Sequence, residues 1–230
     1  DRSVSRGLGD VYKRQDESEA ESFVAGDDVA IAGSEGEAGA SENANALPVA
    51  RQQETAAMTP VERLAAKADG KQWELVENQR GITYYKLFGP YLAGAKKIVV
   101  EDAYVRKPYQ LRNLAEFLEM LLRCKNSDED VAVHLVTGHN DPEFVEAQLN
   151  GLNELASTFS QLGVNLTYEF RDTLHDRSIT ADTGWEILPG RGLDIFQKFV
   201  DGDWLNPLLR HQQLRRVKEC KVTYRRVSEK

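Results

Sequence analysis

Helical and alternating patterns of apolar residues run along the chain everywhere except in its first quarter. A helix is predicted over 60–70, with Thr59 as its N-cap. Residues 73–76 and 82–88 are rich in aromatic and β-branched side chains, and they flank the turn-forming residues 78–81. This pattern predicts a β-hairpin.

Three apolar runs separated by two helical patterns predict an α/β core. Residues 97–101 and 131–137 are short apolar runs, typical of strands that are buried on both faces. Leu and Ala recur at helical spacing over 108–124, and a second helix that ends at Gly163 leads to a strand over 164–170. This order predicts an α/β fold with a largely parallel central sheet flanked by helices, in which ligands gather at the carboxyl ends of the strands.

The C-terminal part of the chain adds shorter elements. A hairpin is predicted over 178–188, with its turn at 182–184, and the Gly-rich stretch 189–192 follows it. A short helix over 193–200 and a final strand over 218–226 complete the predicted domain.

The first 57 residues show no sustained apolar period. Residues 16–57 carry ten acidic residues and one basic residue, and such a segment buries too little apolar surface to offset its ordering entropy. We predict a disordered acidic linker there, with a partner-docking peptide as the alternative. Residues 5–15 resemble the translation of a sequencing-library adapter, so we expect 1–15 to be an artefact and the chain to be a fragment of a longer protein. The folded domain is predicted over 58–230.

The net charge of −8 comes mostly from the acidic segment, so the predicted domain is close to neutral and basic patches can act locally. No apolar run approaches the length of a membrane span, and Cys124 and Cys220 lack metal-binding spacing. We expect a cytoplasmic protein without a metal or cofactor, with peripheral attachment to a membrane as a further possibility.

The densest cluster of polar residues follows the strand predicted over 164–170. His175, Arg177 and Asp182 have the spacing H-x-R-x4-D, and alternation places His175 and Arg177 on one face of an extended segment. This spacing is one residue type away from the H-x-K-x4-D signature of the phospholipase D superfamily. In that superfamily the histidine attacks phosphorus, the lysine neutralises the phosphate, and an acid helps to orient the histidine.

Several stretches around this cluster resemble the phospholipase D-like domain at the C-terminus of MIT-domain-containing proteins that act with ESCRT-III in late cytokinesis. The resemblance extends over about 72–230 and is carried, in order, by 99–106, 110–114, 134–137, 174–187 and 190–196. It implies a phospholipase D-like fold, a catalytically degenerate site, dimerisation and binding of acidic phospholipid. No MIT module is visible in the sequence, so ESCRT-III binding is not expected of this chain.

Arginine in place of lysine favours phosphate binding over turnover, because a guanidinium holds phosphate bidentately but is larger than an ammonium group. We predict that phosphate is bound by His175, Arg177, Gly190, Arg191 and Gly192.

Other polar residues have two interpretations each. His139 and Asp194 are candidate pocket residues, whereas His134 is predicted to be a hydrogen-bonded core histidine. A basic segment contains Arg210, Arg215, Arg216 and Lys218. It is either a solvated face or a surface that binds phosphate and lipid headgroups.

The function that we expect is a non-catalytic phosphate-binding module that recognises acidic phospholipid or another phosphodiester and forms a homodimer. One alternative is a metal-independent phosphodiesterase or nuclease, in which two copies of His175 meet across the dimer and Asp182 retains the acid. The other is a targeting or interaction module for an unknown upstream ATPase or protease domain.

Overall fold

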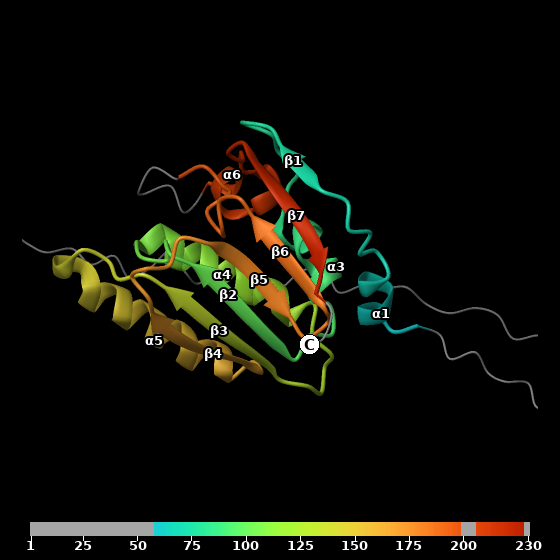
Figure 1. Cartoon of the computed structure of the whole chain (residues 1–230), viewed down its shortest axis with the longest axis horizontal. Helices are drawn as coiled ribbons and strands as arrows, with labels where there is room; N and C mark the ends of the chain where they lie inside the picture. The colour runs from blue at the N-terminus through green and yellow to red at the C-terminus, as the bar shows by residue number, and fades with distance from the viewer. Residues whose placement is uncertain (1–57, 199–205, 228–230) are drawn as a thin grey trace, which may run out of the picture. The chain divides into compact units, whose positions relative to one another are not determined.

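The computed structural model describes residues 58–198 and 206–227, which belong to one unit of the chain. A seven-stranded sheet with the order β1-β7-β6-β5-β2-β3-β4 forms its centre (Figure 1). The strands are β1 (Trp73–Leu75), β2 (Lys97–Asp102), β3 (Val131–Thr137), β4 (Val164–Phe170), β5 (Arg177–Ala181), β6 (Trp185–Pro189) and β7 (Cys220–Arg226).

The α/β class is confirmed, but the sheet is mixed and mostly antiparallel. Strands β2, β3 and β4 run parallel to one another, whereas the pairs β2–β5, β5–β6, β6–β7 and β1–β7 are antiparallel. The expectation of a largely parallel sheet was therefore wrong. The reason is that the β5–β6 hairpin joins the parallel strands at β2, and β7 and β1 extend the same sheet beyond it, all in antiparallel pairs.

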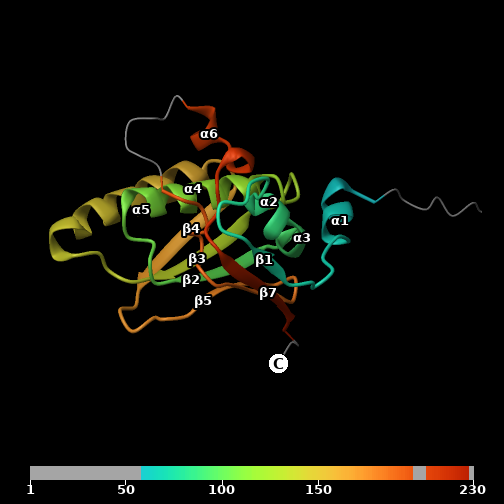
Figure 2. The same cartoon turned by 90° about the horizontal axis from the view of Figure 1, so that it is seen from above.

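The helices cover one face of the sheet. Helices α4 and α5 lie side by side on this face, and none of the described helices lies on the opposite face (Figure 2). The helices are α1 (Pro60–Ala65), α2 (Tyr84–Leu87), α3 (Gly89–Leu92), α4 (Pro108–Leu122), α5 (Val145–Ser160) and α6 (Pro207–Arg210), with 3-10 turns η1 (Pro142–Phe144) and η2 (Gln212–Leu214). None of these helices is long and apolar enough to cross a bilayer.

Strands β2 and β3 are not buried on both faces, contrary to the prediction. Ile98 and Val100 face the helices, whereas Val99 between them is 40% exposed. His134 lies on the same open face as Val99, where its Nδ1 is 2.9 Å from Thr167 Oγ1. It is therefore a hydrogen-bonded histidine, as predicted, but it lies outside the core.

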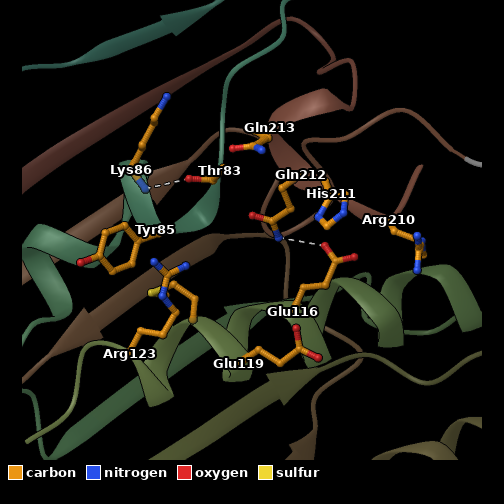
Figure 3. Close-up of a pocket in the computed structure, with 11 residues that line it drawn as sticks. Thr83, Tyr85, Lys86, Glu116, Glu119, Arg123, Arg210, His211, Gln212 and Gln213 are labelled. Carbon is orange, nitrogen blue, oxygen red and sulfur yellow. Dashed lines mark hydrogen bonds between the residues drawn. The ribbon is translucent and has the colours of Figure 1, made fainter. Parts of the chain in front are cut away.

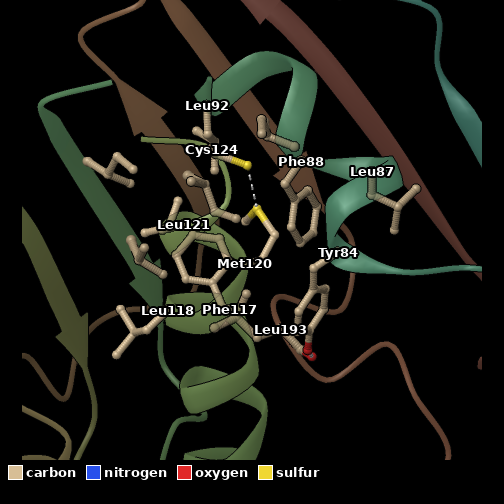
Figure 4. Packing of buried hydrophobic residues seen from close by; sticks show 14 of the residues in the cluster. Tyr84, Leu87, Phe88, Leu92, Phe117, Leu118, Met120, Leu121, Cys124 and Leu193 are labelled. Carbon is tan, nitrogen blue, oxygen red and sulfur yellow. Dashed lines mark hydrogen bonds between the residues drawn. The ribbon is translucent and has the colours of Figure 1, made fainter. Parts of the chain in front are cut away.

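The predicted hairpin over 73–88 does not form. β1 pairs with β7 at the edge of the sheet, and residues 84–87 form helix α2. The Thr83 hydroxyl accepts the Lys86 N–H and so caps this helix. Tyr84 and Phe88 then stack on one face, 5.4 Å between ring centroids, and pack around Phe117 of α4 (Figure 4). Tertiary packing of these aromatic rings outweighs the local strand propensity.

The C-terminal predictions have mixed outcomes. The hairpin of β5 and β6 is confirmed, with Gly184 at φ +80° in its turn. The short helix predicted over 193–200 does not form at 193–198, where Phe196 instead pairs with Val217, and its last two residues lie outside the described ranges. At the other end, α1 has the predicted Thr59 cap but ends at Ala65. The adapter segment and the acidic linker also lie outside the described ranges.

Candidate functional site

The loops that follow several strands lie together at one end of the strands, and not along a lateral edge of the sheet. β2, β3 and β4 end there, and β5 begins there because Asp102 at the end of β2 pairs with Arg177. β6 also ends there, since it runs antiparallel to β5. We call this region the carboxyl edge and define it by residues 102–106, 137–140, 170–177 and 189–194.

Arg177 is held in place at the carboxyl edge by three groups. Its Nη1 donates to the Gly190 carbonyl oxygen at 2.8 Å, and its Cζ lies 4.5 Å from the ring centroid of Tyr104. Its Nε is 3.9 Å from Asp102 Oδ1. The side chain stays 28% exposed. The guanidinium is thus fixed in orientation and partly neutralised, with one side open to solvent.

The carboxylate beside Arg177 is buried. Asp102 accepts the backbone N–H groups of Tyr104 at 3.0 Å and Leu193 at 2.9 Å. Burial raises the pKa of Asp102, while these two N–H groups and the Arg177 guanidinium lower it in part. Gly192 has φ +61°, and a Cβ there would collide with Asp102 Oδ2. Gly192 therefore allows the Gly-rich loop to close over Asp102.

His175 and Asp182, predicted to act together, lie at opposite ends of β5. The His175 side chain is exposed and makes no hydrogen bond or ion pair with the described residues. The Asp182 carboxylate accepts the backbone N–H groups of Lys96 and Lys97 at 3.1 Å. A strand rises roughly 3.3 Å per residue, so the x4 spacing spans most of β5 and separates the two side chains. Within one copy Asp182 does not orient His175.

His139 is the histidine with the most defined setting. Its Nδ1 lies 3.0 and 3.1 Å from the two carboxylate oxygens of Asp172, and its backbone N–H donates to the same carboxylate. Its ring stacks on Phe170 with 4.2 Å between centroids. The backbone N–H of His139 is the main cause that lowers the pKa of Asp172. This arrangement directs the hydrogen bonding of the ring to Nδ1 and leaves Nε2 available to a ligand.

Asp172 was missed from the sequence, although a signal for it exists. His139 follows β3 and Asp172 follows β4, and the two strands are parallel neighbours. Their carboxyl ends therefore meet at one edge, where polar residues come together.

The Gly-rich loop contributes fewer ligand groups than predicted. The Gly190 carbonyl is occupied by Arg177, and Arg191 is exposed with its Nε donating to the Glu219 carbonyl oxygen at 3.0 Å. Asp194 is paired with Lys218 at 2.8 Å. Of these residues, Arg191 is the one that presents positive charge to solvent.

The predicted basic surface is divided by burial and pairing. Arg215 is 5% exposed, pairs with Glu116 at 2.7 Å and stacks on Phe196, while Lys218 is paired with Asp194. Arg210 and Arg216 are the members that remain exposed. The surface is therefore smaller than the sequence suggested.

Arg210 lines a groove of about 460 Å³ between α4 and the C-terminal segment (Figure 3). Figure 3 shows Glu116 and Glu119 on the α4 side of this groove, and Gln212 Nε2 donates to Glu116 at 2.8 Å. Burial and the Glu116 charge raise the pKa of Glu119. The groove thus carries charges of both signs, which does not favour a highly anionic ligand. Among the described residues, no group of three or more His, Cys, Asp or Glu side chains is arranged to hold a metal ion.

The family of this domain is shown by its sequence. Residues 81–226 match the family described as the phospholipase D-like domain at the C-terminus of MIT. This match covers more than half of the chain, so the chain is a member of that family.

A curated relative supports the same assignment. The chain is 36% identical over 138 residues to MIT domain-containing protein 1 of Mus musculus, a match that covers 57% of this chain and 54% of the mouse protein. The chain therefore spans about half of the length of this relative.

Proposed function

We propose that this domain binds a phosphate-bearing ligand at the carboxyl edge and does not turn it over. The observation that carries the proposal is the fixed guanidinium of Arg177, which needs little ordering before it meets an anion. Arg106 approaches the same Tyr104 ring, with its Cζ 5.4 Å from the centroid, and Arg191 extends from the Gly-rich loop. Three arginines, from the loops after β2 and β6 and from the start of β5, thus share one edge.

Binding is favoured over catalysis by the surroundings of the histidine. His175 has no partner among the described residues that would activate it, and Asp182 lies at the other end of β5. Arg177 also shares its charge with Asp102. A phosphohistidine mechanism needs a nucleophile and a general acid, so it would require His175 from a second copy.

The ligand that we propose is an acidic phospholipid headgroup, as the family resemblance implies. Arg191 is exposed, Arg106 and Arg177 are partly exposed, and Tyr104 is 44% exposed. Such side chains suit a membrane surface, where basic and aromatic residues meet headgroups. On this proposal the protein is cytoplasmic, attaches peripherally to a membrane and acts as a homodimer.

Co-sedimentation with vesicles tests this proposal. Vesicles of phosphatidylserine and phosphatidylcholine should retain the protein, and pure phosphatidylcholine vesicles should not. Arg191→Ala should weaken retention about fivefold, since one basic residue near an anionic surface contributes about 1 kcal/mol. Retention should also fall as salt is raised. Arg210→Ala is the matched control because this exposed arginine lies away from the carboxyl edge.

Three outcomes would contradict the proposal. Loss of retention in Arg210→Ala but not in Arg191→Ala would move binding to the C-terminal basic residues. Cleavage of a chromogenic phosphodiester, phosphatidylcholine or single-stranded DNA without added metal, lost in His175→Ala, would make the domain an enzyme. Binding of the protein to single-stranded DNA but not to vesicles would show that the ligand is nucleic acid and not lipid.

A further inference from the structure

A separate cavity of about 230 Å³ lies beside the first turns of α4 and α5. Its walls are mostly apolar and are formed by Pro108, Leu111, Phe144 and Ala147. The cavity is smaller than a typical site for a drug-sized ligand, which begins at about 300 Å³. It therefore suits a ligand with a short apolar body.

The polar side chains in the wall are already satisfied. Gln148, which is 1% exposed, accepts the Asn140 N–H and donates to the carbonyl oxygens of Val105 and Gly138. The Asn140 side chain donates to the Arg106 carbonyl and accepts the N–H of the following residue. Because both N–H groups of the Gln148 amide and one of the Asn140 amide are already used, the wall favours an apolar ligand body.

The rim of the cavity is charged. Arg106 and Lys107 lie next to each other there, and neither has a carboxylate of residues 58–198 or 206–227 within 4.0 Å, although the Arg106 charge lies near enough to Asp172 to lower the pKa of that carboxyl. Arg106 donates its Nε to the Ala103 carbonyl, and its guanidinium is so close to Gly138 that a Cβ there would collide with Nη2. Asp141 is the third charge on the rim, which leaves a net charge of +1. A singly charged anionic head complements this rim.

We propose that the cavity binds a medium-chain carboxylate. The carboxylate lies at Arg106 and Lys107, and the alkyl chain fills the apolar cavity. At roughly 30 Å³ for each water-sized group, the cavity holds about eight non-hydrogen atoms, which corresponds to the chain of octanoate. This inference shares Arg106 with the proposed phosphate site but does not use Arg177 or Arg191, so variants of Arg191 and of Lys107 or Ala147 test the two sites separately.

Isothermal titration calorimetry of the full chain with butanoate, hexanoate, octanoate and dodecanoate tests the proposal. Affinity should rise about fourfold for each added methylene group up to octanoate and then level off, because each buried methylene contributes about 0.8 kcal/mol until the cavity is full. Acetate and 1-octanol should bind much more weakly, since one lacks the chain and the other the charge.

Two pairs of variants test separately how the alkyl chain and the carboxylate of the ligand contribute to binding. Ala147→Phe fills the cavity and should weaken octanoate binding at least about tenfold, whereas Ser157→Phe, at an exposed position of the same helix outside the cavity wall, should not. Lys107→Gln should weaken binding about two- to fivefold. Lys97→Gln, at the first residue of β2 and so at the end of the strand opposite the carboxyl edge, should not. Lys107 is exposed, so its variant is expected to fold even if Ala147→Phe does not.

Either of two results would overturn the proposal: octanoate affinity unchanged in Ala147→Phe or Lys107→Gln, or affinity that keeps rising up to dodecanoate. The second result would indicate adsorption to an apolar surface without a defined length. Arg191→Ala should leave octanoate binding unchanged, so failure of this site and failure of the phosphate site are distinguishable.

Discussion

Position 192 requires glycine for two reasons that can be separated. Gly192 has φ +61°, which L side chains rarely adopt, and a Cβ would also collide with the buried Asp102 carboxylate. Asp102 joins the end of β2 to the Gly-rich loop through the Leu193 N–H. Displacing it would therefore disturb the whole carboxyl edge.

We expect Gly192→Ala to lower the free energy of unfolding by about 3 kcal/mol, measured by urea denaturation. Gly81→Ala is the matched control, because Gly81 has φ +82° but a Cβ added there would meet no atom within 4 Å. It should cost about 1 kcal/mol, the backbone part alone. Equal losses in the two variants would show that Asp102 tolerates the added methyl group.

Elements determined by short-range chemistry were predictable from the sequence. The Thr59 cap of α1, the apolar stripe of α4 and the turn between β5 and β6 depend on residues close together in the chain, and all three are confirmed. β1 was predicted as a strand but with the wrong partner, because β7, which pairs with it in the sheet, lies at the other end of the domain's sequence. Pairing over such a separation leaves no local signature.

The C-terminal segment is attached to α4 through a buried ion pair that the sequence did not reveal. Arg215 sits in a run of basic residues, and such runs are usually solvated. In the structure its Nη1 lies 2.7 and 2.8 Å from the two Glu116 carboxylate oxygens, and its guanidinium stacks on Phe196. The pair therefore holds the segment before β7 against the helix.

Glu116→Ala should lower the free energy of unfolding by about 3 kcal/mol, because it leaves the Arg215 charge buried without its carboxylate. Glu119→Ala, one turn further along α4 and exposed, should cost less than about 0.5 kcal/mol. The double variant Glu116→Leu with Arg215→Met should recover much of the loss, since apolar residues of similar size can replace a buried pair. Similar losses in Glu116→Ala and Glu119→Ala would contradict a special role for the pair.

At the scale of the whole domain, the location of the candidate site was more predictable than its chemistry. Strand order places ligands at carboxyl ends, and His139 and Arg191 come from loops at that edge, where Arg177 begins β5. The spacing H-x-R-x4-D could not show that β5 is a full strand between His175 and Asp182. Burial of Asp102 beside Arg177 likewise depends on the antiparallel pairing of β2 with β5, which the predicted parallel sheet did not contain.

The open face of the sheet offers a surface for a second copy of the chain. Val99 of β2 is 40% exposed on this face, between Thr180 and His134 on the neighbouring strands. A two-fold axis through one self-complementary face is the commonest way to form a dimer.

Light scattering of the full chain at tens of micromolar should therefore give twice the mass of the 25.8 kDa chain. A dissociation constant in this concentration range corresponds to a binding free energy of about −6 kcal/mol. Val99→Glu should shift the protein toward monomer, because two like charges would face each other across the axis without water. Val76→Glu is the matched control, since Val76 is exposed but follows β1 at the edge of the sheet. A monomeric chain at these concentrations would exclude both the dimer and a mechanism with two His175 residues. A dimer that persists in Val99→Glu would instead place the interface on another face.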